Sequence, residues 1–541
     1  MRRSVTPAGV TIVELLIAMT ISLVVLYALM WQFNAGVTQV AEGRASVELL
    51  GQLRATTRTL QLDLRHITGS ARPWATPATS DGYFELIEGP AYDTGQLSSF
   101  GPGGFVDVAA ADMSFGDFDD VLAMTVRSEN GPFVGFYLDT SSAVPVRRSL
   151  DSHYAEVIWW ASWMDRDGNG QPNAGSLPSE VTLYRRLLLV RPDLGIVFRS
   201  YDFAPNGIDP SNQADLATLW NKLKEFYDNN DISTHPEVRR MSGTSKVHME
   251  LVANSLADLT KRENRFCHHP ILAYDNNTNT YSLFSPSYPF DMARGPVRSP
   301  VRRVDFLPAL NTVIKAGDRQ GEDVIQGNIL AFDVKVFDPH ASLIASTSGT
   351  DVLSPNDPGF GRAGTGPGAI SAGEFVDMFY MRYVLPRVAS AYGANPSGWP
   401  AWAVTEPTRV YPLPEYRSHF SAPPAFYDLN NNGVWDPGEP FRGPTVPTYD
   451  TWSFHYEQDG INQDAALAAG APMLFAWRSI VDQGTDGVDN DGIKGVDNPE
   501  ERETWPAYTE PLRAVKVVIR AIEPTSRVVR QLSVIQDFVP F

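Results

Sequence analysis

The first hydrophobic segment of the chain is an apolar run from Val10 to Met30, and its single charged residue is Glu14. A helix of about 20 apolar residues crosses the ~30 Å hydrocarbon core of a bilayer. A charge inside such a span costs roughly 2.5–3.5 kcal/mol on insertion scales and is therefore usually functional. The pattern predicts a transmembrane helix over residues 10–33 with a functional acid near its start.

Beyond Asn34 the apolar residues follow a helical period instead of a continuous run. Spacings of three, four and seven residues place them on one face of a helix, and Gly69 is a stop signal. We expect an amphipathic stalk helix over residues 34–68 that continues the membrane helix, with a combined length of ~88 Å at 1.5 Å per residue. The predicted apolar stripe is Val37, Val40, Val47, Leu50, Leu53, Leu60, Leu64 and Ile67.

Most of the remaining chain alternates between apolar and polar residues over short stretches, which is typical of strands. The clearest pair is Ala514–Ile522 and 528–535, joined by Pro524-Thr525-Ser526, which predicts a C-terminal β-hairpin. Residues 330–337 alternate as cleanly and are expected to pair near this hairpin. The other candidate strands are 121–128, 133–138, 156–163, 181–190 and 328–337.

These patterns predict an α+β fold, with a long N-terminal transmembrane and stalk helix followed by a large β-rich head that contains an antiparallel sheet and loop-rich insertions. Residues 339–425 are rich in Gly, Pro and Ser, so we expect mainly loops there. A helical patch is expected at 216–227. The predicted divisions are a leader at 1–9, the two helical segments 10–33 and 34–68, the first part of the head at 69–200, a polar insertion at 201–326, a core strand at 327–338, a Gly/Pro-rich insertion with acidic loops at 339–510 and the hairpin at 511–541.

The composition of the 541-residue chain favours cations as ligands. The formal charge is −19, and loss of residues 1–9 with Arg2 and Arg3 would take it to −21. Direct binding of nucleic acid requires basic patches and is not expected. The chain has one cysteine, Cys267, so an intramolecular disulfide is excluded and a bound metal ion is an alternative way to stabilise a large domain.

Residues 1–9, MRRSVTPAG, precede the apolar run and end in glycine, and Glu14 is the fifth residue after that glycine. Together these residues resemble the cleavage and methylation signal of type IV pilins and type II secretion pseudopilins. The resemblance is close over residues 1–68, weaker over the C-terminal β-region, and nearest to the PilW-like minor pilins and the J-type minor pseudopilins. One departure from the commonest family pattern is Val10, where phenylalanine is frequent.

The resemblance implies processing and assembly. A prepilin peptidase would cut after Gly9, and the new N-terminal Val10 would be methylated. The protein would sit in the inner membrane as a single-pass precursor, with its C-terminal head in the periplasm or, after assembly, on the cell surface. Other pilin or pseudopilin subunits would be its partners, and Glu14 would neutralise the N-terminal amine of a neighbour. The resemblance implies no enzymatic activity.

Other readings of the N-terminus and of the function remain open. A secretory signal has a shorter apolar core and a small-residue cleavage site after it, Arg2-Arg3 alone suggests twin-arginine export only weakly, and a plain anchor does not need Glu14. The alternative function is a membrane-anchored, calcium-stabilised surface binding protein or adhesin that uses the pilin signal for export. No nucleophile elbow, P-loop or dinucleotide fingerprint supports a hydrolase or another enzyme.

The sequence DLNNNGVWDPGE at residues 428–439 has the spacing of a calcium-binding loop. Its oxygen-bearing residues fall at positions 1, 3, 5, 9 and 12 of an EF-hand-type loop, with glycine at position 6 and a backbone carbonyl at position 7. Neighbouring prolines argue against the paired helices of an EF-hand, and a metal-free Asn/Asp/Gly turn is the alternative. The predicted ligands are Asp428, Asn430, Asn432, Val434, Asp436 and Glu439.

Two further acidic loops fit the spacing less well. In the second loop, residues 489–500, four carboxylates lie close in sequence and would repel one another without a cation. In the third loop, residues 165–173, a metal-free hairpin turn explains the sequence as well as a calcium site does. The predicted ligands are Asp489, Asp491, Asp497 and Glu500 with Asp486 as a substitute in the second loop, and Asp165, Asp167, Asn169 and Asn173 in the third.

The run Cys267-His268-His269 has the residue types of a zinc site but lacks a second Cys/His pair at finger spacing. Adjacent histidines on a strand also point to opposite faces. We therefore expect a structural or incidental role for these residues.

Overall fold

The computed structural model describes most of the helices and strands of the chain. The described residues are 11–69, 81–88, 117–118, 120–139, 145–163, 181–260, 264–266, 272–275, 280–283, 319, 321–346, 349–357, 359–362, 369–378, 380–393, 398–403, 448–451, 512–524 and 526–538.

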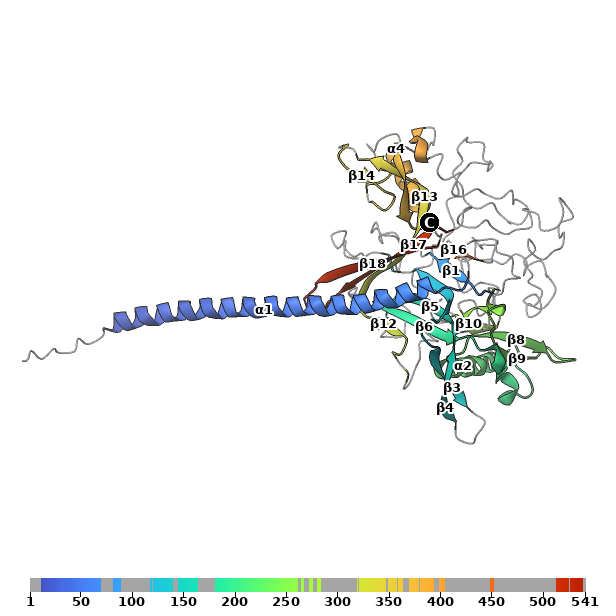
Figure 1. Cartoon of the computed structure of the whole chain (residues 1–541). Coiled ribbons are helices and arrows are strands. Elements are labelled where there is room, and N and C mark those ends of the chain that lie inside the picture. Colours follow the sequence, from blue (N-terminus) through green and yellow to red (C-terminus); the bar gives the residue numbers. More distant parts are fainter. Residues whose placement is uncertain are drawn as a thin grey trace, which may run out of the picture.

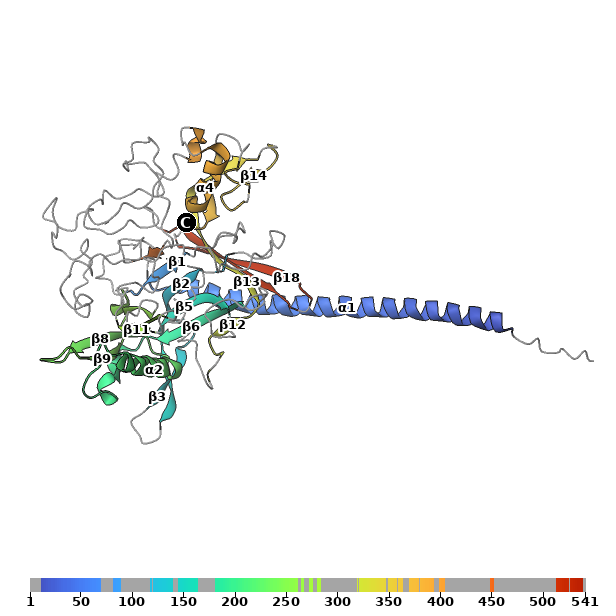
Figure 2. The ribbon, with the colours of Figure 1, turned by 180° about the vertical axis from the view of Figure 1, so that it is seen from behind.

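The most prominent element is α1, a single helix of 54 residues over Ile12–Arg65. At 1.5 Å per residue it is about 80 Å long. Its N-terminal part projects from the head as a straight rod, and its C-terminal part lies against the strands of the head (Figures 1 and 2). The two helical segments predicted from the sequence therefore form one continuous helix, as expected.

In the described part of the chain, the head consists mainly of short strands and includes the helices α2 (Gln213–Asn229) and α4 (Met381–Tyr392). Three 3-10 turns, η4 (Pro192–Leu194), η5 (Ser200–Asp202) and η6 (Asp258–Thr260), connect strands in its middle part. The strands are β1 (Phe84–Ile87), β2 (Val121–Arg127), β3 (Phe133–Asp139), β4 (Val146–Ser152), β5 (Tyr154–Trp163), β6 (Val181–Leu189), β7 (Ile196–Arg199), β8 (Thr234–Arg240), β9 (Val247–Ala253), β10 (Leu272–Asp275), β11 (Thr280–Leu283), β12 (Val324–Gln326), β13 (Ile329–Ala345), β14 (Val352–Leu353), β15 (Ala369–Val376), β16 (Thr448–Asp450), β17 (Ala514–Ile522) and β18 (Val529–Asp537).

Two antiparallel sheets form the centre of the head. The first has six strands in the order β12-β6-β5-β2-β1-β16, and the second has five, in the order β14-β13-β17-β18 with β15 also paired to β13. The C-terminal hairpin is β17–β18, and β13 pairs with β17 from Ile329 to Val336. The predictions of this hairpin and of the neighbouring strand are therefore confirmed. Candidate strands 121–128, 133–138, 156–163 and 181–190 correspond to β2, β3, β5 and β6.

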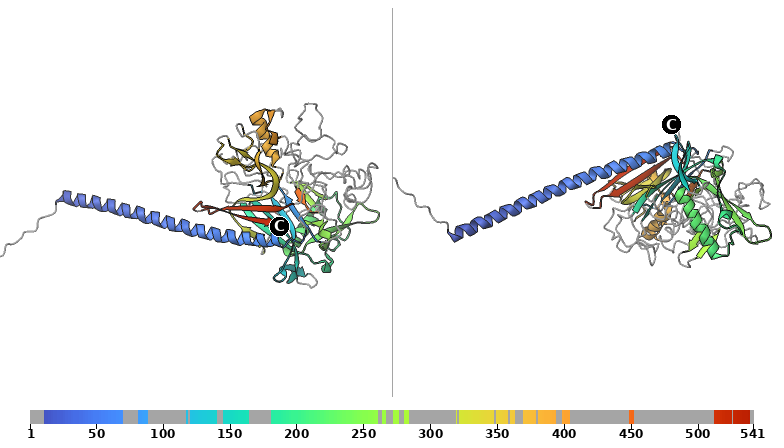
Figure 3. Two further views of the ribbon diagram at one scale, coloured as in Figure 1. Left: turned by 45° about the horizontal axis from the view of Figure 1, so that its top comes forward. Right: turned by 90° about the horizontal axis from the view of Figure 1, so that it is seen from below.

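The main hydrophobic core lies where α1 meets both sheets. Apolar side chains of the helix, of the six-stranded sheet and of β13, β17 and β18 form one buried cluster, and Figure 3 shows the end of α1 lying along these strands. The opposite face of the six-stranded sheet packs against α2 and the three-stranded sheet β7-β9-β8 in a second cluster. The helix expected near residues 216–227 is thus α2, and it covers the far side of the sheet from α1.

Residues 339–403 differ from the prediction of mainly loop structure. Strand β13 continues to Ala345 and pairs with β15, and α4 follows. These elements share a separate buried core that includes Phe360, Val384 and Trp402. This part of the head lies on the side opposite the β3–β4 hairpin (Figure 1). The expectation of loops is wrong here because long-range pairing with β13 and a short amphipathic helix supply the structure that the local Gly/Pro composition disfavours.

Candidate functional site

The first turn of α1 holds the acid that the sequence singled out. Thr11 is the N-cap: its side chain accepts a hydrogen bond from the Glu14 amide at 3.3 Å. In return, Glu14 Oε2 accepts hydrogen bonds from the Thr11 amide and the Thr11 hydroxyl, each at 2.9 Å. This reciprocal arrangement is a capping box, and it satisfies donors that the first turn of a helix leaves free.

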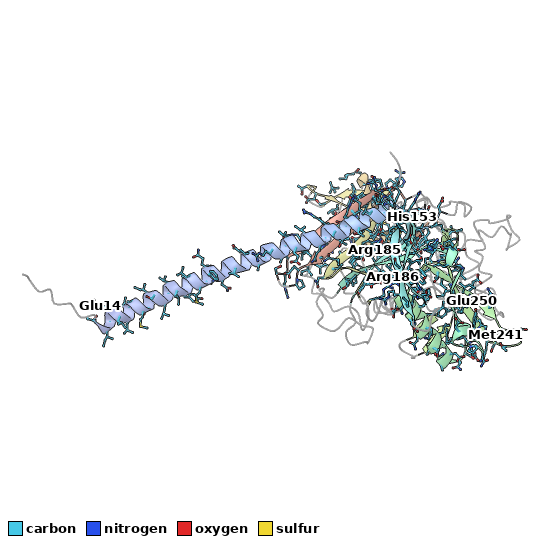
Figure 4. The ribbon with its side chains drawn as sticks, turned by 60° about the horizontal axis from the view of Figure 1, so that its bottom comes forward. Glu14, His153, Arg185, Arg186, Met241 and Glu250 are labelled. Atoms are coloured by element: carbon cyan, nitrogen blue, oxygen red, sulfur yellow. The ribbon has the colours of Figure 1, made fainter. Side chains whose placement is uncertain are left out.

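Glu14 lies at the end of α1 that is far from the head (Figure 4). Within the described part of the chain its carboxylate is bonded only to Thr11 and has no basic partner. The exposed acid therefore carries a charge that no other described residue of this chain neutralises.

The apolar side chains that follow Glu14 are also exposed. The structure has one helix long and apolar enough to span a membrane among the residues described, and none of its apolar window is buried within the protein. The exposed fractions run from 52% for Val25 to 80% for Ile12 across this half of the helix. An apolar surface of this extent favours burial in lipid or against other apolar helices.

The second half of α1 is fixed in the head. Leu53, Leu60 and Leu64 of the predicted stripe are at most 1% exposed, and they pack in the main core. The N-terminal part of the same stripe is different, because Val40 and Val47 remain 57% and 72% exposed. The helix thus changes from an uncovered to a covered apolar face near the point where it reaches β17 and β18.

A buried acid locks the C-terminal end of α1 to the six-stranded sheet. Arg185 of β6 donates two hydrogen bonds to the Asp63 carboxylate, at 2.7 and 2.9 Å, and Trp159 of β5 donates a third from its indole nitrogen at 2.8 Å. The Asp63 and Arg185 side chains are only 6% and 14% exposed. Arg185 is labelled in Figure 4, near the C-terminal end of α1.

Two polar contacts add to this attachment along the helix. Gln326 of β12 contacts Gln52 and Thr56 of α1, at 3.2 and 3.5 Å. Arg530 of β18 donates to the Ser46 hydroxyl at 2.8 Å. The stalk is therefore held by strands of both central sheets.

Most of the other predicted site residues lie outside the described residues. This applies to Gly9 and Val10, to the loop 428–439, to the cluster 486–500, to the loop 165–173 and to the run 267–269. The processing, calcium and Cys/His interpretations of these segments therefore stay predictions.

The structure brings together a group of buried acids that the sequence analysis did not single out. Oxygens of Glu88, Asp117 and Asp377 lie within 4.8 Å of one another, and all three side chains are buried. The ammonium of Lys335 contacts Asp377 and lies 2.9 Å from Asp333. These residues come from four separate segments of the chain, so no local sequence pattern indicates them.

Another buried acid, Glu156 of β5, is held by three hydrogen bonds. Glu156 accepts from the Tyr83 hydroxyl at 2.8 Å, the Ser233 hydroxyl at 2.5 Å and the Phe266 amide at 2.9 Å. Burial raises the pKa of the Glu156 carboxyl above its ordinary value, and these hydrogen bonds and the nearby Arg265 oppose that rise. Glu156 therefore serves the internal packing of the head.

No family model, curated protein or solved structure matches this chain. The function is therefore inferred from the residues and geometry described above.

Proposed function

We propose that the protein is a minor pilin or pseudopilin that joins a type IV pilus or a type II secretion pseudopilus. The observation that carries this proposal is the division of α1: an exposed, membrane-length apolar half that bears one acid, Glu14, and a second half fixed in a large β-rich head. Membrane insertion of the first half leaves the head on the other side. The second half then connects the head rigidly to whatever the first half assembles with.

Glu14 gives this assembly its specificity. Cleavage after Gly9 would leave Val10 as a cationic N-terminus four residues from Glu14, on the same face of the helix. Both charges are costly in lipid, and pairing between the acid of one subunit and the amine of the next offsets that cost. A helix that slides out of register loses the pair, so the charge selects one packing arrangement.

The head favours a minor position, at the tip of the filament. It carries the two central sheets, the layer formed by α2 and the β7-β9-β8 sheet, and the 339–403 segment on the end of one helix. A domain of this width would crowd a repeating lattice of helices, whereas a tip has neighbours on one side only. Finding the protein evenly along purified filaments would contradict this placement.

The test combines processing with assembly. Mass spectrometry of the full-length protein, expressed with its own secretion or pilus system, should find a mature N-terminus at Val10 with one added methyl group. Glu14→Ala should leave this processing intact and abolish co-purification with the other pilin-like subunits. The matched control is Glu48→Ala, which removes an acid from an exposed position of the same helix outside the apolar span and should assemble normally.

Two results would overturn the proposal. One is a purified protein that begins at Met1 or after the apolar span. The other is normal incorporation of Glu14→Ala into the assembly.

We also propose that the head binds calcium through the loop Asp428–Glu439, with the 486–500 cluster as a second site. The support is the spacing of oxygen ligands in the sequence and the acidic balance of the chain. An ion that binds only the native state stabilises it, so chelator should lower the thermal unfolding temperature of the full chain. Asp436→Asn should remove most of that sensitivity, and an unchanged temperature with and without calcium would reject the site.

A calcium-stabilised surface binding protein or adhesin is the second candidate function, favoured by the same loop sequences. It shares the membrane anchor with the first candidate but needs no partner subunits. Retention of the protein as a lone membrane species, with no pilin-like protein in its pull-down, would favour it.

A further inference from the structure

Lys335 is a buried amine in direct contact with a buried carboxylate of a neighbouring strand. The antiparallel register pairs Val336 of β13 with Val376 of β15, which places Lys335 opposite Asp377, the residue that follows β15. The Lys335 ammonium contacts Asp377 Oδ1 and lies 2.9 Å from Asp333 Oδ2. The side chains of Lys335 and the two aspartates are 4%, 1% and 1% exposed.

The pair lies in the interior of the head. Val336 and Val376 are 1% and 0% exposed, and Met378 on the other side of Asp377 is 0% exposed. A nucleophile and an electrophile held in contact react as parts of one molecule, which removes most of the entropic cost of bringing them together. A site without bulk water also favours a condensation, because the water that forms leaves it.

Two further carboxyl groups face Asp377. The Met378 amide donates to Glu88 Oε2 at 3.0 Å and fixes this side chain beside Asp377. Oxygens of Glu88, Asp117 and Asp377 lie within 4.8 Å of one another. Glu88 therefore lies where it can exchange a proton with the Asp377 carboxyl.

We propose that Lys335 and Asp377 condense to an intramolecular amide bond that links β13 to the end of β15. Asp333 first takes a proton from the Lys335 ammonium, and the freed amine attacks Cγ of Asp377. Glu88 protonates the developing oxyanion, and the tetrahedral carbon then expels one of its oxygens. The nitrogen gives its second proton to the oxygen that Glu88 protonated, and this oxygen departs as water. In balance, one ammonium and one carboxylate become one secondary amide and one water, with no oxidant, reductant or other reactant.

The bond would have a mechanical purpose. It closes residues 336–376 into a covalent loop, so the segment with β14 and β15 would stay attached to β13 under load. A cross-link between residues distant in sequence also restricts the unfolded chain, in the way that a disulfide does. This chain has a single cysteine and cannot use an intramolecular disulfide for the purpose.

The test reads the bond directly from the mass of the protein. The full-length protein, purified in detergent and denatured, should be lighter by one water molecule than the mass calculated from its observed N-terminus. After proteolysis, the peptides that contain Lys335 and Asp377 should be recovered as one branched species, and the two linear peptides should be lost. Quantitative recovery of both linear peptides from the wild-type protein would overturn the proposal, leaving an ion pair only.

Variants assign the roles. Lys335→Arg keeps a buried cation and should restore the linear Asp377 peptide and the missing water mass. Glu88→Gln keeps an oxygen that can accept from the Met378 amide, and it should slow formation of the cross-link without removing the partners. An undiminished cross-link in Glu88→Gln would overturn the assignment of Glu88 as proton donor. None of these outcomes depends on processing at Gly9 or on assembly, so the bond and the proposed function fail separately.

Discussion

An acidic residue lies near each end of α1, and the two differ in burial and in their partners. At the head end, the Asp63 carboxylate is buried and receives three hydrogen bonds from Arg185 and Trp159. At the far end, Glu14 is exposed and is bonded only to Thr11 of its own first turn. The charge of Asp63 is therefore neutralised within the fold. Glu14 is held in position by Thr11, but no described residue neutralises its charge.

This difference separates a structural charge from one that is available to a partner. A buried ion pair such as Asp63–Arg185 costs desolvation of both groups, and loss of one partner leaves the other charge unpaired. Glu14 carries no such dependence, because no part of the head relies on it. We therefore expect that changes at Asp63 affect folding and that changes at Glu14 affect assembly alone.

Asp63→Ala tests the comparison with the largest effect. Removing the acid leaves the largely buried Arg185 without its counter-ion, which typically costs about 3–5 kcal/mol of unfolding free energy. Urea unfolding of the full-length protein in detergent, followed by the tryptophan signal of the head, should show this loss. Glu14→Ala and Glu48→Ala should each stay within about 0.5 kcal/mol of the wild type, as exposed substitutions do.

A small effect of Asp63→Ala would contradict the view that this pair locks the helix. A large loss of head stability in Glu14→Ala would contradict the independence of the exposed end.

The sequence pattern predicted the helix but not what covers it. The stripe from Val37 to Ile67 has one period throughout, yet only its C-terminal part is buried in this chain: Leu60 is 0% exposed and Val47 is 72% exposed. Periodicity reports that a face is apolar and does not report whether the chain itself or another molecule covers it. The sequence shows that Asp63 is a charged residue on the apolar face formed by Leu60 and Leu64. It does not show that the partner of Asp63 lies on β6.

Matched leucines on α1 sharpen the comparison further. Leu60→Ala should destabilise the head by about 2–5 kcal/mol, because it opens a cavity in the main core. Leu23 belongs to the same helix but is 62% exposed, so Leu23→Ala should leave the unfolding of the head unchanged. The same two variants, scored by co-purification with partner subunits, should show whether the exposed half serves packing between subunits.

Equal destabilisation by Leu60→Ala and Leu23→Ala would show that the two halves of the helix are not energetically separate.

Elements defined by long-range contacts were the hardest to predict. The hairpin β17–β18 and strand β13 were predicted because each alternates locally. The segment 339–403 was expected to be mainly loop, although Met381, Val384, Leu385 and Val388 already have helical spacing. Proline and glycine around them weakened that signal, and the pairing of β15 with β13 has no local signature. The contact of Lys335 with Asp377 follows from that pairing and could not be read from the sequence.

Glu156 offers a third kind of acid and the smallest expected effect. It is buried like Asp63, but hydrogen bonds hold it in place of an ion pair, and burial raises its pKa above the ordinary value of 4.5. The folded state therefore binds the proton more tightly than the unfolded state. This contribution to stability is fully present below the ordinary pKa and is lost as the pH rises through the raised one.

Glu156→Gln imitates the protonated form, so the unfolding free energy of the variant should fall less over this pH window than that of the wild type. Glu48→Gln removes one charge from the exposed face of α1 and controls for net charge. A wild-type pH profile reproduced unchanged by Glu156→Gln would assign the pH dependence to other groups.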